Sequence, residues 1–599
     1  MSITDIKYGN SVKKLMVLCC SLYLGNAVCL SQNPQNEKIE FPKEKVYLHV
    51  NTTLAFVGEY ILYSLYCLDD KNLKPSKISK IAYVDLIGEN GEYVFQQKLR
   101  LEQGRSYSDF FIPTSVPSGN YKLVGYTQWM KNFGVMGFYR QDITIINPYT
   151  GDQSVFLEKD LDSLAGILNV TETLEKKKGN LVREASEDLE IQLNSSEMGK
   201  RGKNSFSLRP KTPIAELYNV SISVRKIDAL PSPHRTTATK TKGNAGMETP
   251  SKASSANEYQ FLPEIRGALL SGKVRSKETG KPQRGVGVSL SVPGHSTHFK
   301  TATTNDNGDF HFSIDTAYEG ETAIIQVLGT APGAYQLEIV QSQSPDMGKS
   351  DFYDFKLTKD MEHIILARSF HNQIENAFFS VKPDTIPTVE IKTPFFLKNS
   401  LEFNLDDFTR FATLRETVIE IVEHLWINRE SPDYRSFKVR VNPPYSESDN
   451  KPLVLIDGIQ VLDHESLMDF NARQIQTIDV GRNRYVFGKE MYDGVIRIQT
   501  KEGNYFPVLN DVSAKKVKLF RPQGQKKYFR QTYQENTISK SKRTPDFRYQ
   551  LMWIPTGQLT SDTEFVFYSS DIQGTFEIVI EGFSENGNAL FAREVFYVE

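Results

Sequence analysis

The sequence Lys45-Val-Tyr-Leu-His-Val-Asn51, followed closely by Phe56-Val-Gly58-Glu59, decides the fold expected for the N-terminal part of the chain. Apolar residues alternate with other residues here, and this period of two predicts a β-strand with one buried face. Short stretches of this kind, separated by turn residues, continue through residues 38–148. Asn90-Gly91 stands between two of them, and this dipeptide is typical of a hairpin turn. Residues 38–148 are therefore predicted to form a β-sandwich.

The same residues resemble a macroglobulin-like domain of the MG2 type. The stretch that begins at Lys45 is similar to the opening of such a domain, and Pro117-Ser-Gly119-Asn-Tyr121 resembles the Pro-x-Gly-x-Tyr motif at the start of a later strand in this family. Strand patterning returns after a polar stretch near residue 189. We therefore expect a linker and a second macroglobulin-like sandwich in residues 149–229.

Residues 230–259 differ in composition from the segments on either side. They consist mainly of Ser, Thr, Lys, Ala and Pro and contain almost no bulky apolar side chain. Such a segment cannot offset the entropy lost on ordering by burying apolar surface. A flexible linker or loop is the prediction for this range.

A further sandwich is predicted in residues 260–397, together with connecting strands. The stretches Leu270-Ser-Gly272-Lys-Val274 and Thr304-Asn-Asp306-Asn-Gly308-Asp-Phe310-His-Phe312 resemble the carboxypeptidase regulatory-like domain, which is a small prealbumin-like sandwich. Asp306 and Gly308 belong to a turn, because glycine tolerates positive φ there. Phe310 and Phe312 are two residues apart and therefore point to one face of a strand.

The pattern changes to a helical one after Asp406. Large apolar residues recur at intervals of three and four between Phe408 and Leu425, which predicts an amphipathic helix. Thr413 and Glu416 have the spacing of a capping box. We interpret the acidic pair Asp406-Asp407 as an N-cap that compensates the helix dipole rather than as a functional pair of carboxylates.

The most specific motifs in the chain follow this helix. They are Pro452-Leu-Val-Leu-Ile-Asp457-Gly458-Ile-Gln-Val461 and Tyr492-Asp-Gly494-Val-Ile-Arg-Ile-Gln-Thr-Lys-Glu-Gly503. In order and spacing they resemble the plug domain of TonB-dependent outer-membrane receptors, which implies a small α+β plug-like domain in residues 398–505. Asp457, Gly458, Gly494 and Gly503 are expected to meet the conformational requirements of turns, so their predicted roles are architectural.

A plug without its own barrel would set this protein apart from a receptor. A barrel of 22 strands with about ten residues each needs several hundred residues after the plug, whereas this sequence ends at Glu599. Residues 515–599 alternate again and are predicted to form a C-terminal β-sandwich. The expected fold class is therefore mainly β, with tandem macroglobulin-like and prealbumin-like sandwiches and one small α+β domain, a combination that resembles large exported proteins of Bacteroidetes-type bacteria.

Residues 1–31 are predicted to be a signal peptide. Lys13 and Lys14 precede a short apolar run, and small residues lead to a cleavage site before Gln32. The alternative is acylation at Cys29, which would anchor the protein by a lipid. The protein is expected to be exported and either periplasmic or associated with the outer membrane, and display on the cell surface remains open.

The charge and the cysteine content of the chain argue against a nucleic-acid partner and against stabilisation by disulfides. The chain has 71 basic and 73 acidic residues, so its formal net charge of -2 gives no field that would attract nucleic acid. Three of its four cysteines lie in the predicted signal peptide, and the fourth is Cys67. No disulfide framework is expected, and Cys67 is interpreted as a buried structural residue.

No catalytic, cofactor-binding or metal-binding residue is predicted. His295 and His298 have the spacing of metal ligands but lack a recognisable third ligand, and His49 belongs to a strand pattern. Gly-x-Ser-x-Gly, P-loop and His-Glu-x-x-His motifs are absent. A macroglobulin thioester is excluded, because no cysteine follows Cys67.

Three hypotheses about function follow. The first is a non-enzymatic scaffold or accessory subunit that binds an outer-membrane β-barrel or its complex in transport, barrel assembly or secretion, with membrane association through that partner. The second is a surface binding protein or adhesin that recognises a glycan or a protein. The third is an enzyme with an unrecognised site. Trp129, Phe133 and Trp553 could contact a partner, but most aromatic residues of sandwiches lie in the core.

Overall fold

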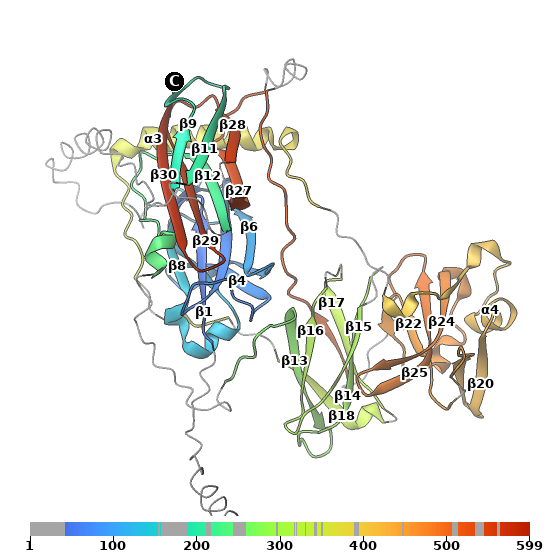
Figure 1. The fold of residues 1–599 in the computed structure, drawn as a ribbon. Helices are drawn as coiled ribbons and strands as arrows, with labels where there is room; N and C mark the ends of the chain where they lie inside the picture. Colours follow the sequence, from blue (N-terminus) through green and yellow to red (C-terminus); the bar gives the residue numbers. More distant parts are fainter. Residues whose placement is uncertain are drawn as a thin grey trace, which may run out of the picture.

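β-Strands dominate the computed structural model of this chain, and their sheets pack in pairs, as the fold class predicts (Figure 1). The structure describes residues 42–151, 153, 156, 189–210, 217–242, 259–294, 298–316, 318, 320–329, 331–340, 344–348, 351–387, 394–445, 448–505, 513–533, 544–559 and 563–599. The predicted signal peptide and His295 lie outside these residues. Within them, no helix is long and apolar enough to cross a membrane.

The predicted N-terminal sandwich is present, and we call it the first sandwich. One of its sheets has the order β1-β3-β6 and the other the order β2-β8-β7-β4-β5. Its strands are β1 (Glu44–Val50), β2 (Leu54–Phe56), β3 (Tyr60–Asp69), β4 (Ile81–Gly88), β5 (Tyr93–Arg100), β6 (Arg105–Phe111), β7 (Gly119–Tyr126) and β8 (Tyr139–Ile146). Asn90 and Gly91 lie in the loop of the β4–β5 hairpin, where Gly91 has a φ of 82°. The hairpin predicted from these residues is therefore confirmed.

The separate sandwiches predicted for residues 149–229 and 515–599 are wrong, because their strands form one sandwich, which we call the shared sandwich. Its sheets have the orders β10-β30-β29-β12-β27 and β28-β11-β9. The strands are β9 (Leu189–Leu193), β10 (Glu197–Met198), β11 (Lys203–Pro210), β12 (Tyr218–Lys226), β27 (Gln550–Leu559), β28 (Thr563–Tyr568), β29 (Gly574–Ser584) and β30 (Ala589–Val598). The physical reason is burial: Ile222 of β12 is fully buried in a core with Ile578 and Ile580 of β29, so neither half has a complete core alone.

The predicted regulatory-like region also contains a sandwich, which we call the middle sandwich. Its sheets have the orders β16-β13-β18 and β15-β14-β17-β26. The strands are β13 (Ala268–Ser276), β14 (Gly287–Val292), β15 (His298–Thr303), β16 (Asp309–Ile314), β17 (Thr322–Val327), β18 (Tyr335–Val340) and β26 (Ala514–Lys518). Gly308 has a φ of 74° in the turn before β16, and Phe310 and Phe312 are both buried, as predicted.

The connecting strands expected after this sandwich are replaced by helix α3 (Glu362–Ala377). The helix buries Arg368 completely, and this side chain forms ion pairs with Glu59 and Asp228. Hydrophobic periodicity alone does not predict this helix, because the large side chain that the helix buries, Arg368, is charged.

The flexible linker expected at residues 230–259 is partly wrong. Its first part is packed against the first and the shared sandwich and contains the 3-10 helix η3 (Ala238–Lys242). The Tyr47 hydroxyl donates to the carbonyl of Thr236, and the N–H of Ala238 donates to the Glu581 carboxyl group. Hydrogen bonds to the backbone therefore replace the apolar burial that the sequence lacks. Residues 243–258 lie outside the described residues.

Residues 398–505, which we call the plug-like unit after the prediction from the sequence, have a sheet of order β19-β24-β25-β22-β23 and a separate β20–β21 hairpin. Its elements are β19 (Leu401–Asn404), α4 (Leu414–Glu420), β20 (Leu425–Ser431), β21 (Tyr434–Val439), β22 (Leu453–Ile456), β23 (Ile459–Gln460), β24 (Ile475–Phe487) and β25 (Glu490–Thr500). The helix is shorter than the predicted range from Phe408 to Leu425. Thr413 and Glu416 form the predicted capping box at its start.

Asp406 and Asp407 do not cap this helix, contrary to the prediction. They lie in the 3-10 turn η9 (Leu405–Asp407), where Asn404 provides the cap, and Asp406 forms an ion pair with Arg410. Thr413 caps the helix instead. Its side chain accepts a hydrogen bond from the N–H of Glu416, and the Glu416 carboxylate accepts one from the N–H of Thr413.

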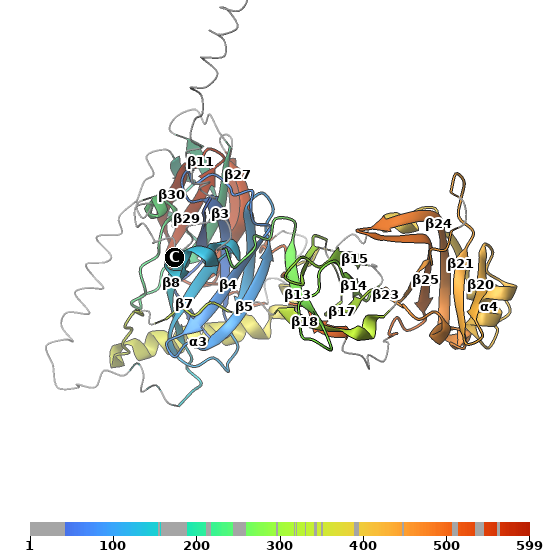
Figure 2. The same ribbon diagram turned by 90° about the horizontal axis from the view of Figure 1, so that it is seen from below.

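The chain passes through these units and then returns. After the plug-like unit it adds β26 to the middle sandwich, runs along the first sandwich and completes the shared sandwich (Figures 1 and 2). Figure 2 shows the middle sandwich between the plug-like unit and the two other sandwiches. The C-terminal segment thus connects all four units.

Candidate functional site

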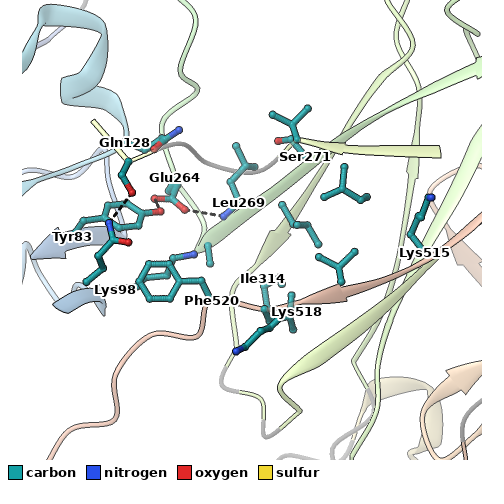
Figure 3. A pocket seen from close by; sticks show the side chains of 18 of the residues that line it. Tyr83, Lys98, Gln128, Glu264, Leu269, Ser271, Ile314, Lys515, Lys518 and Phe520 are labelled. Atoms are coloured by element: carbon teal, nitrogen blue, oxygen red, sulfur yellow. Dashed lines mark hydrogen bonds between the residues drawn. The ribbon is translucent and has the colours of Figure 1, made fainter. Parts of the chain in front are cut away.

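A cleft of about 740 Å³ lies between the first and the middle sandwich (Figure 3). We call it the interdomain cleft. One wall comes from β4, β5 and β7 of the first sandwich, and the other from β13, β16, β18 and β26 of the middle sandwich. Its volume falls within the range of small-molecule and peptide sites, and such sites often lie at domain boundaries.

Glu264 joins the two walls of the cleft. Its Oε2 accepts a hydrogen bond from the Tyr83 hydroxyl at 3.0 Å, and its Oε1 accepts from the backbone N–H of Leu269 at 2.9 Å. Its carbonyl also accepts from the N–H of Lys80. Burial raises the pKa of Glu264, and the nearby Lys98 opposes this shift. One side chain from the connecting segment therefore fixes the start of β13 to the first sandwich.

Asp85 lies on the wall formed by the first sandwich and is almost completely buried. Its Oδ2 accepts from the Tyr126 hydroxyl at 2.9 Å. Burial raises the pKa of Asp85 to about 6. The carboxyl group thus loses its charge more readily than that of an exposed aspartate.

Two lysines lie over aromatic rings at the same wall. The Nζ of Lys98 is 5.6 Å from the centre of the Tyr83 ring and 5.2 Å from that of Phe520, and Lys131 lies over Tyr83 and Tyr126. Burial lowers the pKa of both ammonium groups. Such cation–π contacts stabilise the two ammonium groups at the cleft.

The side chains that line the cleft are carboxyl, ammonium, hydroxyl, amide and apolar groups. No cysteine or histidine is among the described residues that line it. No group of three or more His, Cys, Asp or Glu that could hold a metal ion occurs in the described part of the chain. The polar groups present can accept, donate and provide charge to a bound chain or small molecule.

Two serine–histidine contacts are present, and the serine of the second, Ser271, lines the cleft. The Nδ1 of His49 is 2.6 Å from Oγ of Ser221 in the contact between the first and the shared sandwich, and both residues are fully buried. Burial lowers the pKa of His49. The Nδ1 of His311 is 2.8 Å from Oγ of Ser271 at the surface. In the described residues, neither histidine has a carboxylate hydrogen-bonded to its other nitrogen, so neither contact forms a triad.

The turn residues singled out in the sequence do not converge on one site. The Asn90-Gly91 and Asp306–Gly308 turns belong to different units, the first and the middle sandwich. Asp457 and Gly458 have φ values of 47° and 84° in the predicted turn between β22 and β23. These values are typical of the turn that Asp-Gly favours in a two-residue hairpin.

Asp457 also ties this hairpin to the end of β25, which the sequence did not indicate. Its Oδ1 accepts from the N–H of Thr500 at 2.8 Å, and its Oδ2 accepts from the N–H of Tyr505 at 2.9 Å. Gly503, with a φ of 60°, lies in the turn between these donors. The expectation of a turn at Gly494 is wrong: this glycine lies inside β25, opposite a register shift in β24, with a φ of 92°.

Other candidate residues are mostly structural. Cys67 is buried, as predicted, and burial raises the pKa of its thiol. Trp129 and Trp553 are also buried. The Nδ1 of His298 lies 3.1 Å from Oγ1 of Thr316. The cleft itself was not predicted, because the residues that line it come from four distant segments of the sequence.

Comparisons with known proteins leave the family open. No protein-family model matches the sequence, and no curated protein matches it. A Salmonella alpha-2-macroglobulin mutant aligns at 9% identity over 93% of this chain and 39% of its own, with a TM-score of 0.22. An Escherichia coli alpha-2-macroglobulin activated by porcine elastase aligns at 8% identity over 93% of this chain and 43% of its own, also with a TM-score of 0.22. This chain therefore spans about two fifths of the length of these proteins, and a TM-score of 0.22 is too low to establish its fold or function.

Proposed function

We propose that this protein is a non-enzymatic, exported scaffold that binds an outer-membrane β-barrel or its complex through the plug-like unit. The observation that carries the proposal is the edge strand β19. In the described part of the chain β19 pairs only with β24, and it begins at Leu401, whose side chain is 38% exposed. Phe395, just before it, is 61% exposed. A strand edge with no second partner strand among the described residues is suited to pairing with a strand of another protein.

The position of the plug-like unit supports the same proposal. It is attached firmly to the middle sandwich, because the ring of Phe487 packs at 5.1 Å against Phe299 and the N–H of Gln460 donates to Oγ of Ser291. The middle sandwich in turn contacts the first sandwich through Glu264. The scaffold would thus present its plug-like unit at a fixed distance from the other sandwiches (Figure 2).

Affinity purification from native envelopes tests this function. The tagged protein is extracted in mild detergent, and proteins that co-purify in stoichiometric amounts are identified by mass spectrometry. Recovery of an outer-membrane barrel supports the proposal. Recovery of the protein alone, together with protease accessibility on intact cells, contradicts it and favours a surface protein that binds a glycan or a host protein.

A pair of variants connects the result to β19. We expect Phe395→Asp combined with Leu401→Asp to lose the barrel, because the two substitutions place charge at the start of β19 and just before it. Ile419→Asp is the matched control, since this side chain is 65% exposed on α4 of the same unit. Equal recovery with both variants would show that β19 does not contact the barrel.

Mass spectrometry of the mature N-terminus distinguishes cleavage before Gln32 from acylation at Cys29.

A further inference from the structure

A second cavity, of about 220 Å³, lies where α3 meets the first and the shared sandwich, and we call it the α3 cavity. Its walls come from α3 and the residues just after it, from the start of β3, from residues 528–529, and from β12 and β27. The side chains that line it include Tyr60, Arg225, Phe379, Phe547, Tyr549 and Trp553. A cavity of about 150 Å³ lined by apolar side chains holds one benzene molecule. The α3 cavity therefore has room for one aromatic ring with a short polar group attached.

Aromatic rings form much of the apolar wall of the α3 cavity. The rings of Tyr60 and Phe379 lie nearly parallel, at an angle of 21° with their centres 6.4 Å apart. The ring of Phe547 is stacked on His371 of α3, with ring centres 4.5 Å apart. Aromatic rings attract one another in offset stacks and in edge-to-face contacts. These walls therefore favour a ring over an aliphatic group of similar size.

Arg225 places a buried cation at the cavity. Its side chain is 7% exposed, and in the described part of the chain it forms one ion pair, a 3.5 Å contact with Glu59. Both oxygens of Glu59 already accept from Arg368, at 2.8 and 2.7 Å. Nη2 of Arg225 has no hydrogen-bond partner among the described residues. Because a guanidinium group has five N–H donors, Arg225 retains donors for a further acceptor.

The neighbouring strand provides a second buried donor. Trp553 is 4% exposed, and its Nε1 has no hydrogen-bond partner among the described residues. Trp553 is opposite Ser223 of β12, two positions before Arg225, so Trp553 and Arg225 lie on the same face of the sheet. Burying an N–H group without an acceptor is costly. Two such donors on one face that lines a cavity suit a group with two acceptor oxygens.

The charged network around Arg225 contains more cations than anions. Its ion pairs join four arginines to three carboxylates, namely Arg225, Arg235, Arg368 and Arg593 to Glu59, Asp228 and Glu577. Arg225 connects the two parts of this network, because its charge contributes to lowering the pKa of both glutamates. Buried charges are stable when they are paired. One further negative charge at Arg225 would balance the network.

We propose that the α3 cavity binds an aromatic ring that carries a carboxylate, with the ring against the aromatic walls and the carboxylate on Arg225 and Trp553. This group occurs in an aromatic amino acid and at the C-terminus of a chain that ends in an aromatic residue. Hydrogen bonds between a guanidinium group and a carboxylate are charge-assisted and about twice as strong as neutral ones. The site lies outside the plug-like unit and does not depend on whether that unit binds a barrel.

Isothermal titration calorimetry with the full chain tests the site. The probes are N-acetyl-phenylalanine, its amide, which lacks the carboxylate, and N-acetyl-leucine, which lacks the ring. We expect saturable binding of N-acetyl-phenylalanine and about tenfold weaker binding of each other probe, because one loses a charge-assisted hydrogen bond and the other loses the ring contacts. Absence of saturable binding by N-acetyl-phenylalanine, or equal binding of either other probe, would overturn the proposal.

Free phenylalanine and the peptide Gly-Gly-Phe distinguish the two sources of this chemistry. Both place a carboxylate beside an aromatic ring, but only the peptide has an acylated nitrogen. Tighter binding of phenylalanine would assign the site to a free amino acid, and tighter binding of Gly-Gly-Phe would assign it to the C-terminus of a partner chain. Failure of both to bind would contradict the proposal.

A pair of tryptophan variants tests the indole donor. Trp553→Phe keeps an aromatic ring but removes Nε1–H, and we expect it to bind N-acetyl-phenylalanine about fivefold more weakly, because one hydrogen bond is lost. Trp426→Phe, on β20 of the plug-like unit, is the matched control and should bind as the unmodified chain does. Equal binding by the two variants would contradict the contact between Trp553 and the carboxylate.

Arg225→Lys tests the cation in the same way. It keeps a positive charge near Glu59 but loses the forked donors of the guanidinium group, so we expect about tenfold weaker binding of N-acetyl-phenylalanine. Arg284→Lys, at an exposed arginine, is the control. Unchanged binding by a folded Arg225→Lys variant, with folding checked by circular dichroism, would contradict the proposed contact. The comparison of N-acetyl-phenylalanine with its amide uses the unmodified chain and decides the proposal even if this variant does not fold.

Discussion

Nη2 of Arg368 lies 2.7 Å from Oε2 of Glu59, although 309 positions separate the two residues in the sequence. Nε of Arg368 also donates to Oε1 of Glu59 at 2.8 Å, which makes the contact bidentate, and Nη1 pairs with Asp228. Arg368 is 1% exposed. Burial alone would raise the pKa of Glu59, but the Arg368 guanidinium group outweighs this and holds the pKa below its usual value. This contact fastens α3 to the first sandwich.

Removing this cation should destabilise the protein strongly. Arg368→Met keeps most of the side-chain volume but leaves Glu59 and Asp228 buried without their main partner. A broken buried ion pair of this kind typically costs about 3–5 kcal/mol of the free energy of unfolding. Urea unfolding followed by circular dichroism measures the change.

Arg284→Met provides the matched control. Arg284 also forms an ion pair, with Asp306, but the two side chains are 77% and 76% exposed. Its loss should change the free energy of unfolding by no more than about 0.5 kcal/mol. Similar effects of the two substitutions would show that the buried pair has no special role.

Asp85 should give the contact between the first and middle sandwiches a characteristic pH dependence. Its pKa of about 6 lies above that of an exposed aspartate, so between about pH 4 and pH 6 the folded chain binds a proton that the unfolded chain has lost. The contribution of this group to stability therefore falls as the pH rises through that window. In the unmodified chain this group should lower the free energy of unfolding by about 2 kcal/mol between pH 4 and pH 7, and Asp85→Asn should abolish that decrease.

Unfolding midpoints across this pH range check the prediction for Asp85. Asp306→Asn, at an exposed carboxylate, is measured under the same conditions as the comparison. A profile for Asp85→Asn that runs parallel to that of the unmodified chain would contradict the raised pKa.

Asp546 should produce the opposite behaviour at acid pH. Burial alone would raise the pKa of this carboxyl group, but the nearby Arg548 and Lys382 outweigh that effect and lower the pKa to about 2. The stabilisation that comes from this carboxylate is therefore complete above about pH 4 and is lost as the pH falls towards 2. Asp546→Asn should lower stability at pH 7 and flatten the acid limb of the unfolding profile. The exposed Asp433 is the control, and an unchanged acid limb in Asp546→Asn would refute the assignment.

Two glycines with similar backbone angles should differ in their tolerance of alanine. Gly91 and Gly494 have φ values of 82° and 92°, which cost a residue with a Cβ about 1–2 kcal/mol. A Cβ on Gly91 meets nothing within 4 Å, whereas a Cβ on Gly494 would lie 2.7 Å from Cβ of Val439. Gly494→Ala should therefore destabilise the plug-like unit by about 1–3 kcal/mol more than Gly91→Ala destabilises the first sandwich. Hydrogen exchange of each unit measures the two effects, and equal losses would argue against the clash.

Much of the local structure was predictable because short-range interactions decide it. The Asn90-Gly91 hairpin, the Asp457-Gly458 turn and the Thr413 capping box each depend on residues within a few positions of one another. Gly494 shows the limit of this reasoning. A glycine is favoured both in turns and in strand irregularities, and the sequence does not show that Gly494 lies opposite a register shift in the neighbouring strand.

The candidate site was not predictable in the same way. Asp85, Glu264, Glu338 and Lys518 come from four separate segments, and each alone resembles an ordinary charged surface residue. The burial of Asp85 and Glu264, and the pKa shifts that result, depend on the fold that brings these segments together.

The sequence by itself determined that the chain is mainly β, where many of its strands and turns lie, and where a helix begins in the plug-like unit. The tertiary structure alone decided which strands pair: β12 lies between β27 and β29, more than 300 residues later in the chain, and β26 completes a sheet begun before the plug-like unit. The physical reason is that alternation specifies which face of a strand is buried but not which neighbour buries it. Partner choice depends on burial shared across the whole fold, and the cleft between the sandwiches is a product of that choice.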